Sequence, residues 1–127
     1  MDTSSLIEYT ILVVDDSMAM RQLISYTLQG AGYRVIEAVD GKDAVNKIKE
    51  NKIDLVVSDL NMPNMNGMEF LKYLRDHDDF ESTPLIMLTT EAQRSAIVTA
   101  KDIGITGWVL KPFDPKKLVD RVKKILQ

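Results

Sequence analysis

The sequence contains no cysteine and only one histidine, His77, among its 127 residues. The lack of cysteine excludes a disulfide framework and any metal site with thiolate ligands. A single histidine, flanked here by acidic residues at positions 76, 78 and 79, does not make a zinc site, so we interpret His77 as a solvated loop residue. Any metal site in this chain must therefore use oxygen ligands.

The sequence also lacks long hydrophobic runs and a surplus of basic residues. No apolar run reaches the ~18–20 residues of a membrane helix, and the N-terminus has no signal-peptide pattern. Lysine and arginine number 16 against 19 aspartate and glutamate, for a net charge of −3. Nucleic-acid binders usually carry a basic excess. We therefore expect a cytoplasmic protein that binds neither membranes nor nucleic acids.

Short apolar runs alternate with amphipathic segments, and this alternation predicts the fold. The runs at residues 9–14, 33–38, 54–58, 84–88 and 106–110 are typical of strands covered on both faces. Apolar residues at helical spacing, Leu23 among them, predict helices near residues 20–28, 44–48, 70–74, 92–103 and 118–126. This order indicates an α/β fold with a doubly wound parallel sheet. We expect residues 1–8 to form a tail and residues 9–127 a single domain.

Polar side chains follow four of the five predicted strands. In chain order they are Asp15 and Asp16, Asp59, Thr89, and Lys111. Because ligands of parallel α/β sheets bind beyond the carboxyl ends of the strands, we expect these groups to form one site. Asp54 opens the third strand instead, so we expect it at the opposite edge as a solvated carboxylate.

Three carboxylates at one point require a positive partner. At ~4 Å each like-charged pair costs roughly 4 kcal/mol at an effective dielectric of 20, and Lys111 alone does not offset this. Either a carboxylate takes up a proton or a divalent cation binds, and oxygen ligands at an accessible site favour Mg²⁺. Asp59 is ionised at neutral pH, so it could attack a phosphoryl group without a general base. Lys111 and Thr89 would then face the transferring oxygens.

Each residue of this set also has an ordinary structural interpretation. Asp15, Asp16 or Ser17 could cap the next helix, and Asp59 could begin a turn. A lone threonine is more often a structural hydroxyl, and a lone lysine a solvated charge. The convergence of all of them at one sheet edge favours the phosphate site.

Four motifs around these residues resemble a known family. They span residues 11–17, 58–67, 88–92 and 107–113 and read ILVVDDS, SDLNMPNMNG, LTTEA and GWVLKPF. In this order and spacing they resemble the response-regulator receiver family, especially its chemotaxis regulators of the CheY type. The resemblance covers nearly the whole chain and implies a flavodoxin-like (βα)5 fold with strand order 2-1-3-4-5.

The resemblance implies roles for the matching residues. Asp59 would be the phosphoacceptor, and Thr89 and Lys111 would contact the phosphoryl group. The implied Mg²⁺ ligands are Asp15, Asp16, Asp59 and the backbone carbonyl of Asn61. Asn61 and Glu91 would tune hydrolysis of the aspartyl phosphate, and their pairing is like that of CheY, so we expect a short-lived phosphorylated state.

Other positions in the motifs carry further expectations. The resemblance implies a cis bond between Lys111 and Pro112. Thr90 occupies a position where the family often has alanine or glycine, so access for the phosphodonor is expected to be tighter. Trp108 replaces the usual tyrosine or phenylalanine, a ring that swings inward in the family when the threonine moves toward the phosphate. We expect the larger indole to restrict that swing.

The implied function is a phosphorylation-dependent switch, not an enzyme with separate substrates. The phosphodonor would be a sensor histidine kinase, of the CheA type in chemotaxis, and the target a flagellar motor switch protein. The fourth helix, fifth strand and fifth helix would form the target face around Trp108. Arg121 and Lys124 would give this face a basic fringe suited to an acidic partner.

Several alternatives remain at this point. The chain ends in the last predicted helix, which favours a stand-alone receiver over one excised from a larger regulator or hybrid kinase; a phosphorelay receiver is a further possibility. Haloacid-dehalogenase-type phosphatases have Asp-x-Asp after the first strand, whereas this chain has Asp15-Asp16-Ser17. A flavodoxin needs a hydroxyl- and glycine-rich phosphate loop there. A receiver-like module that is never phosphorylated is disfavoured because no active-site residue type is missing.

Overall fold

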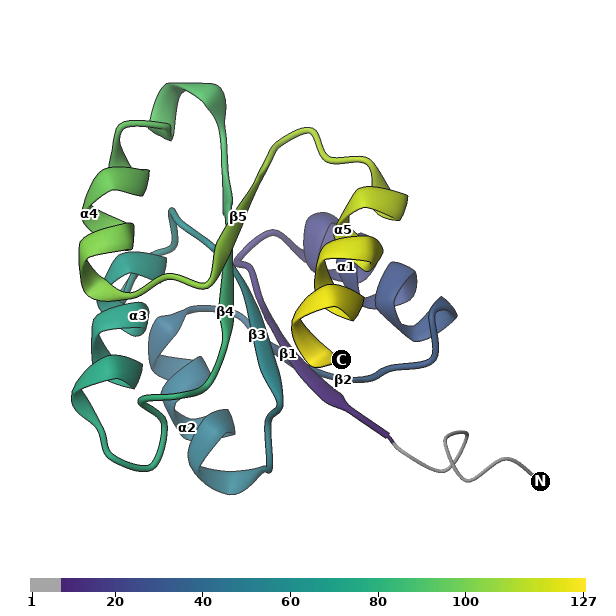
Figure 1. The fold of residues 1–127 in the computed structure, drawn as a ribbon, viewed down its shortest axis with the longest axis horizontal. Coiled ribbons are helices and arrows are strands. Elements are labelled where there is room, and N and C mark those ends of the chain that lie inside the picture. Colours follow the sequence, from purple (N-terminus) through teal and green to yellow (C-terminus); the bar gives the residue numbers. More distant parts are fainter. Residues whose placement is uncertain (1–7) are drawn as a thin grey trace.

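One five-stranded parallel sheet forms the centre of the computed structural model, which describes residues 8–127 (Figure 1). The strand order is β2-β1-β3-β4-β5, which confirms the predicted order and fold class. The strands are β1 (Thr10–Val14), β2 (Arg34–Ala38), β3 (Leu55–Asp59), β4 (Leu85–Thr89) and β5 (Gly107–Leu110). The helices are α1 (Met18–Gly30), α2 (Gly41–Glu50), α3 (Gly67–Asp76), the short 3-10 helix η2 (Glu91–Gln93), α4 (Ala96–Ile103) and α5 (Pro115–Leu126). The predicted tail lies outside the described residues apart from Glu8.

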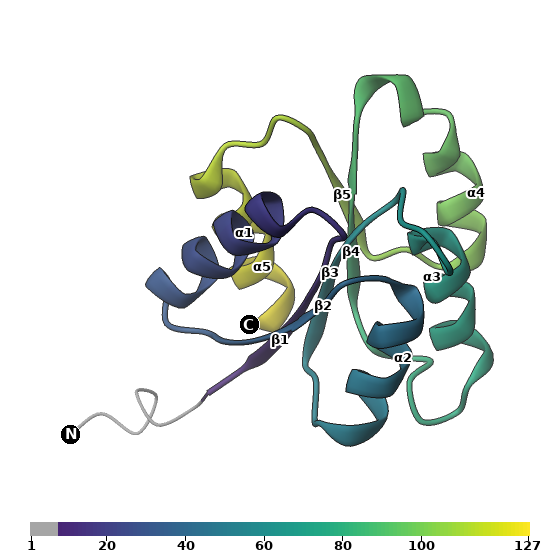
Figure 2. The same ribbon diagram turned by 180° about the vertical axis from the view of Figure 1, so that it is seen from behind.

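Helices cover both faces of the sheet, with α1 and α5 on one face and α2, α3 and α4 on the other (Figures 1 and 2). Successive residues of β1 alternate between the two cores: Leu12 packs on the α3 side with Phe70, and Val13 packs on the α5 side with Leu118. Every residue of β3 and β4 is buried, including the polar residues at their carboxyl ends. No helix within residues 8–127 has the length and apolar character to cross a membrane.

The strand ends differ from the prediction in a way that affects the site. The predicted third and fourth strands stop at positions 58 and 88, but the ladder continues by one residue, pairing Asp59 with Leu88 and Thr89 with Leu110. Asp59 and Thr89 are therefore the last residues of β3 and β4, not loop residues. Their backbone is fixed by the sheet.

Two helix predictions were wrong in detail. The helix predicted over residues 92–103 is split into η2 and α4. The break follows from a local turn, in which the Thr90 N–H donates to Gln93 Oε1 at 2.9 Å and the Gln93 N–H donates to the Thr90 carbonyl at 3.0 Å. Leu23 belongs to α1 but is 48% exposed, so it lies beside the apolar stripe of that helix and not within it.

Candidate functional site

The carboxyl ends of the strands bring the predicted acidic residues together. Carboxylate oxygens of Asp15, Asp16 and Asp59 all lie within 4.8 Å of one another. Asp15 is 1% exposed and Asp59 7%, whereas Asp16 is exposed to solvent. Ser17 caps α1 by accepting the Met20 N–H, so the interpretation of Asp15 or Asp16 as the helix cap was wrong. Neither carboxylate is therefore used as the side-chain cap of α1.

Lys111 partly neutralises this cluster. Its Nζ lies 2.9 Å from Asp59 Oδ1 and 3.8 Å from Asp15 Oδ2. Lys111 follows β5, and its backbone N–H donates to the Thr89 carbonyl at 2.7 Å, which joins the ends of β4 and β5. The peptide bond from Lys111 to Pro112 is cis, as expected. One ammonium faces three carboxylates, so the cluster keeps a net negative charge.

The pKa of the Asp15 carboxyl shows that its ionised form is disfavoured in this arrangement. Burial raises the pKa of the Asp15 carboxyl above its usual value, and the charge of Asp59 raises it further. A hydrogen bond from the Ser17 N–H to Asp15 Oδ1, 2.9 Å long, opposes this rise. Asp15 Oδ2 is buried and has no hydrogen-bond partner. A buried carboxylate oxygen without a donor, beside two other carboxylates, fits a hard divalent cation such as Mg²⁺.

Thr89 adds a second unpaired group at the same edge. Its side chain is fully buried at the end of β4, and its Oγ1 has no hydrogen-bond partner. A buried hydroxyl normally finds a partner, because leaving it unpaired costs roughly 1–3 kcal/mol. The hydroxyl has no partner within the protein, so it can donate to an anionic oxygen of a ligand bound at this edge of the sheet.

Asp54 lies at the opposite end of the sheet, as predicted, but it is not simply solvated. It is half-buried, and its Oδ2 accepts the Thr10 N–H at 2.8 Å. The carboxylate therefore satisfies a backbone donor at the start of β1. That structural role separates Asp54 from the site residues.

Gly67 and Arg21 contribute to the site but were not predicted from the sequence. A Cβ on Gly67 would collide with the Asp59 carbonyl, and the Gly67 N–H donates to the Leu60 carbonyl at 2.9 Å. The glycine after Asn66 in the second motif was the available signal. Arg21 donates to the Asp15 carbonyl at 2.8 Å. Nothing in the sequence pattern distinguishes it from a solvated arginine.

Comparison with known proteins identifies the arrangement. The profile of the response regulator receiver domain family matches residues 11–123. This chain belongs to that family. It is 38% identical over 118 residues to the chemotaxis protein CheY1 of Helicobacter pylori, covering 91% of this chain and 95% of the relative. The chemotaxis response regulator CheY4 of Vibrio cholerae has a TM-score of 0.88 at 42% identity, covering 94% and 100% of the two chains.

Receiver domains of other settings share the fold. The signal receiver domain of a signal transduction histidine kinase from Syntrophus aciditrophicus superposes with a TM-score of 0.87 at 28% identity, covering 93% of this chain and 89% of that one. The flavodoxin and haloacid-dehalogenase interpretations are set aside, because the family match spans the sheet and all four motifs.

The two predicted hydrolysis-tuning residues of this receiver are exposed and lie shortly after the ends of β3 and β4. Asn61 follows β3 and is exposed. Glu91 opens η2, is exposed, and pairs with Arg94 at 3.0 Å. An exposed ion pair of this kind is a weak restraint, so Glu91 is free to take other positions.

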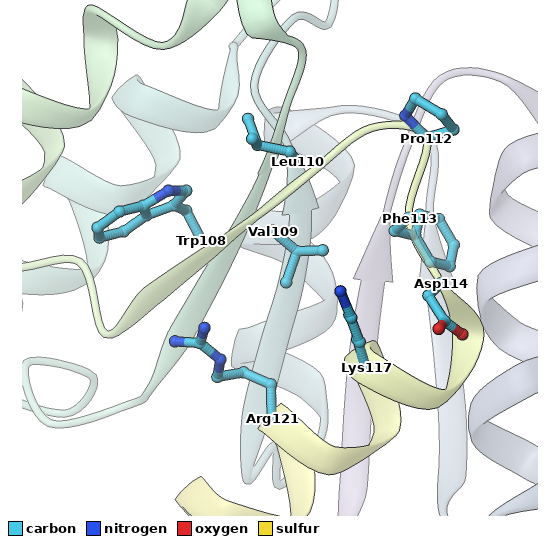
Figure 3. Close-up of a pocket in the computed structure, with 8 residues that line it drawn as sticks. All are labelled: Trp108, Val109, Leu110, Pro112, Phe113, Asp114, Lys117 and Arg121. Atoms are coloured by element: carbon cyan, nitrogen blue, oxygen red, sulfur yellow. The ribbon is translucent and has the colours of Figure 1, made fainter.

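The predicted target face of the receiver surrounds β5. Trp108 is half-buried and extends toward α4, where Lys101 Nζ lies 4.7 Å from the ring centroid (Figure 3). Val109 points the opposite way, toward α5. A cavity of about 400 Å³ lies between β5 and α5, with Arg121 at its wall. Arg121 and Lys124 are both exposed on α5, as predicted.

His77, which was predicted to be a solvated loop residue, is exposed at the end of α3.

Proposed function

We propose that this receiver domain takes a phosphoryl group onto Asp59 from a histidine kinase and binds a target while phosphorylated. The observation that carries the proposal is the pair of buried oxygens without hydrogen-bond partners, on Asp15 and Thr89, at the same edge of the sheet as Asp59. One fits a cation and the other fits a phosphoryl oxygen. The expected Mg²⁺ ligands are Asp15, Asp16, Asp59 and the Asn61 carbonyl.

The chain's own residues account for the transfer. An ionised oxygen of Asp59 attacks the phosphorus of a phosphohistidine, the bond from phosphorus to the donor nitrogen breaks, and the imidazole leaves with the bonding electrons. The Lys111 ammonium faces the added negative charge, and the Thr89 hydroxyl donates to a phosphoryl oxygen. Mg²⁺ would supply charge neutralisation and orientation when bound. Asn61 and Glu91 would set how readily water attacks the product.

The switch follows from a hydrogen bond that forms only after phosphorylation. The Thr89 hydroxyl has no partner within the unphosphorylated domain and gains the phosphoryl oxygen on transfer, which favours a rearranged state of β4 and β5. Trp108 lies on β5 two residues before Leu110, the partner of Thr89 in the sheet, and Lys101 lies over its ring on the α4 side. Arg121 and Lys124 give the face a positive charge that suits an acidic target.

A chemotaxis role is the form of this function that the relatives support best. The Helicobacter and Vibrio relatives are chemotaxis proteins by name. We infer a CheA-type kinase as phosphodonor, a flagellar motor switch protein as target, and the cytoplasm as location. The similarity to a receiver domain of a histidine kinase favours a second candidate, in which this domain serves a larger regulator or a phosphorelay.

The test is phosphorylation by acetyl phosphate and Mg²⁺, followed by intact-protein mass spectrometry. Wild type and Asp54→Asn are expected to gain one phosphoryl group, because Asp54 lies at the far end of the sheet. Asp59→Asn is expected to gain none, and EDTA is expected to abolish the adduct in wild type. An adduct on Asp59→Asn, or one that forms equally in EDTA, would overturn the proposal.

A further inference from the structure

Asp15 is held at three of its four polar atoms. Its N–H donates to the Ala38 carbonyl at 3.2 Å, its Oδ1 accepts the Ser17 N–H at 2.9 Å, and its carbonyl accepts from Arg21 Nη1 at 2.8 Å. Only Oδ2 has no hydrogen bond. The first two partners are backbone groups. Within residues 8–127, Arg21 therefore supplies the one side-chain hydrogen bond to Asp15.

Arg21 is itself fixed by a second acceptor. Its Nε donates to Glu37 Oε1 at 2.9 Å, and its side chain is only 12% exposed. Glu37 belongs to β2 and is paired with Val13 of β1 in the sheet register. The guanidinium thus links α1, the turn after β1 and the edge strand β2. A planar guanidinium presents two N–H donors in a fixed geometry, which a lysine ammonium does not.

We propose that Arg21 is a positioning residue for the metal site, because its bond to the Asp15 carbonyl keeps Oδ2 in the carboxylate cluster. The inference deepens the proposed function and rests on it, since it concerns a ligand of the same ion. Partners that orient metal ligands typically contribute about 10–100-fold to metal affinity. Arg21 acts through the backbone, so the lower end applies. We expect about 10-fold weaker Mg²⁺ binding in Arg21→Gln.

The Mg²⁺ affinities of variants, measured by calorimetric titration, distinguish a positioning role of Arg21 from an effect of its charge. Arg21→Lys keeps the charge but not both bonds, so it should bind Mg²⁺ several-fold more weakly than wild type. Arg34→Gln removes the same charge from β2, where the side chain is exposed and 3.9 Å from Glu8, and should match wild type. Glu37→Gln keeps an acceptor for Arg21 and should bind Mg²⁺ nearly as wild type does.

Amide exchange in the metal-free protein gives a readout independent of activity. The Ser17 N–H reports on Asp15, because it donates to Asp15 Oδ1. In Arg21→Gln the exchange of Ser17 should accelerate by more than that of the amides in β3 and β4. A general loss of stability would accelerate all of them together.

Several results would overturn the inference. They are Mg²⁺ affinity unchanged in Arg21→Gln, an equal loss in Arg34→Gln, wild-type affinity in Arg21→Lys, or uniform acceleration of exchange. If Arg21→Gln does not fold, Glu37→Ala replaces it, since that variant releases Arg21 while leaving it in the protein. Wild type that binds no Mg²⁺ would refute the proposed function, whereas wild-type binding with unaffected variants refutes only the role of Arg21.

Discussion

Replacing Asp15 with asparagine should stabilise the metal-free protein and abolish its response to Mg²⁺. The asparagine keeps an oxygen to accept the Ser17 N–H, so the turn after β1 stays intact. What changes is the charge on a side chain that is 1% exposed. The effect on stability therefore measures the electrostatic cost of the site.

The magnitude can be worked from the distances. Because carboxylate oxygens of Asp59 and Asp15 lie within 4.8 Å, Asp59 repels Asp15 by at least about 3.5 kcal/mol at an effective dielectric of 20. Lys111, 3.8 Å from Asp15 Oδ2, attracts it by about 4 kcal/mol on the same scale. Lys111 thus roughly offsets Asp59, but the exposed Asp16, within the same 4.8 Å, adds a repulsion that solvent partly screens, and the burial of the carboxylate without a donor to Oδ2 adds a cost of its own. That cost is about 1–3 kcal/mol, so Asp15→Asn should unfold at a higher temperature by several degrees.

Thermal unfolding in EDTA and in excess Mg²⁺ provides the assay. In EDTA the variant should be more stable than wild type. In Mg²⁺ the order should reverse, because binding to the native state stabilises only wild type. Asp54→Asn is the matched control: its carboxylate is satisfied by the Thr10 N–H, so it should be no more stable than wild type in either buffer. An Asp15→Asn protein that is no more stable than wild type in EDTA would refute this reasoning.

Three further predictions concern groups around the site. Hydrogen bonds from the Asp43 N–H and then from the Asn64 amide lower the pKa of the Asp40 carboxyl. The carboxylate therefore adds to the free energy of unfolding above its unfolded-state pKa, and this contribution is lost as the pH falls through its folded-state pKa. In acid unfolding, wild type should lose more stability than Asp40→Asn. Gly67→Ala should cost about 1–3 kcal/mol in urea unfolding and slow phosphorylation, because its Cβ meets the Asp59 carbonyl. Thr89→Val should leave metal-free stability unchanged or raised, yet abolish the change in Trp108 emission on phosphorylation.

The location of the site could be predicted from the sequence, because ligands of parallel α/β sheets bind beyond the carboxyl ends of the strands. Asp15, Asp59, Thr89 and Lys111 each stand at or just after the end of a predicted apolar strand, and parallel strands place such positions at one edge. Strand ends were predicted less well, since the ladder from Asp59 to Leu88 continues through a polar residue. Apolar runs mark the interior of a strand, not its last hydrogen bond.

Contacts between distant segments were beyond prediction from patterns. Arg21 and Glu37 are 16 residues apart, and their ion pair depends on how α1 packs beside β2. Asn64 donates to Asp40 across 24 residues, joining the loop after β3 to the start of α2. Periodicity reports which face of an element is buried. It does not report which polar side chains meet above that face.

The unpaired oxygens connect the stability of this domain to its proposed switching. Four buried side-chain atoms within residues 8–127 have no hydrogen-bond partner, and two of them, Asp15 Oδ2 and Thr89 Oγ1, belong to residues at the same sheet edge as Asp59. A ligand shifts an equilibrium only through a difference in its interactions with the two states. A Thr89 hydroxyl that gains a bond worth about 1–1.5 kcal/mol on phosphorylation shifts the two states by roughly tenfold. A hydroxyl already bonded to another protein group would have to give up that bond and so would gain less, which is why a Thr89 hydroxyl without a protein partner suits a switch.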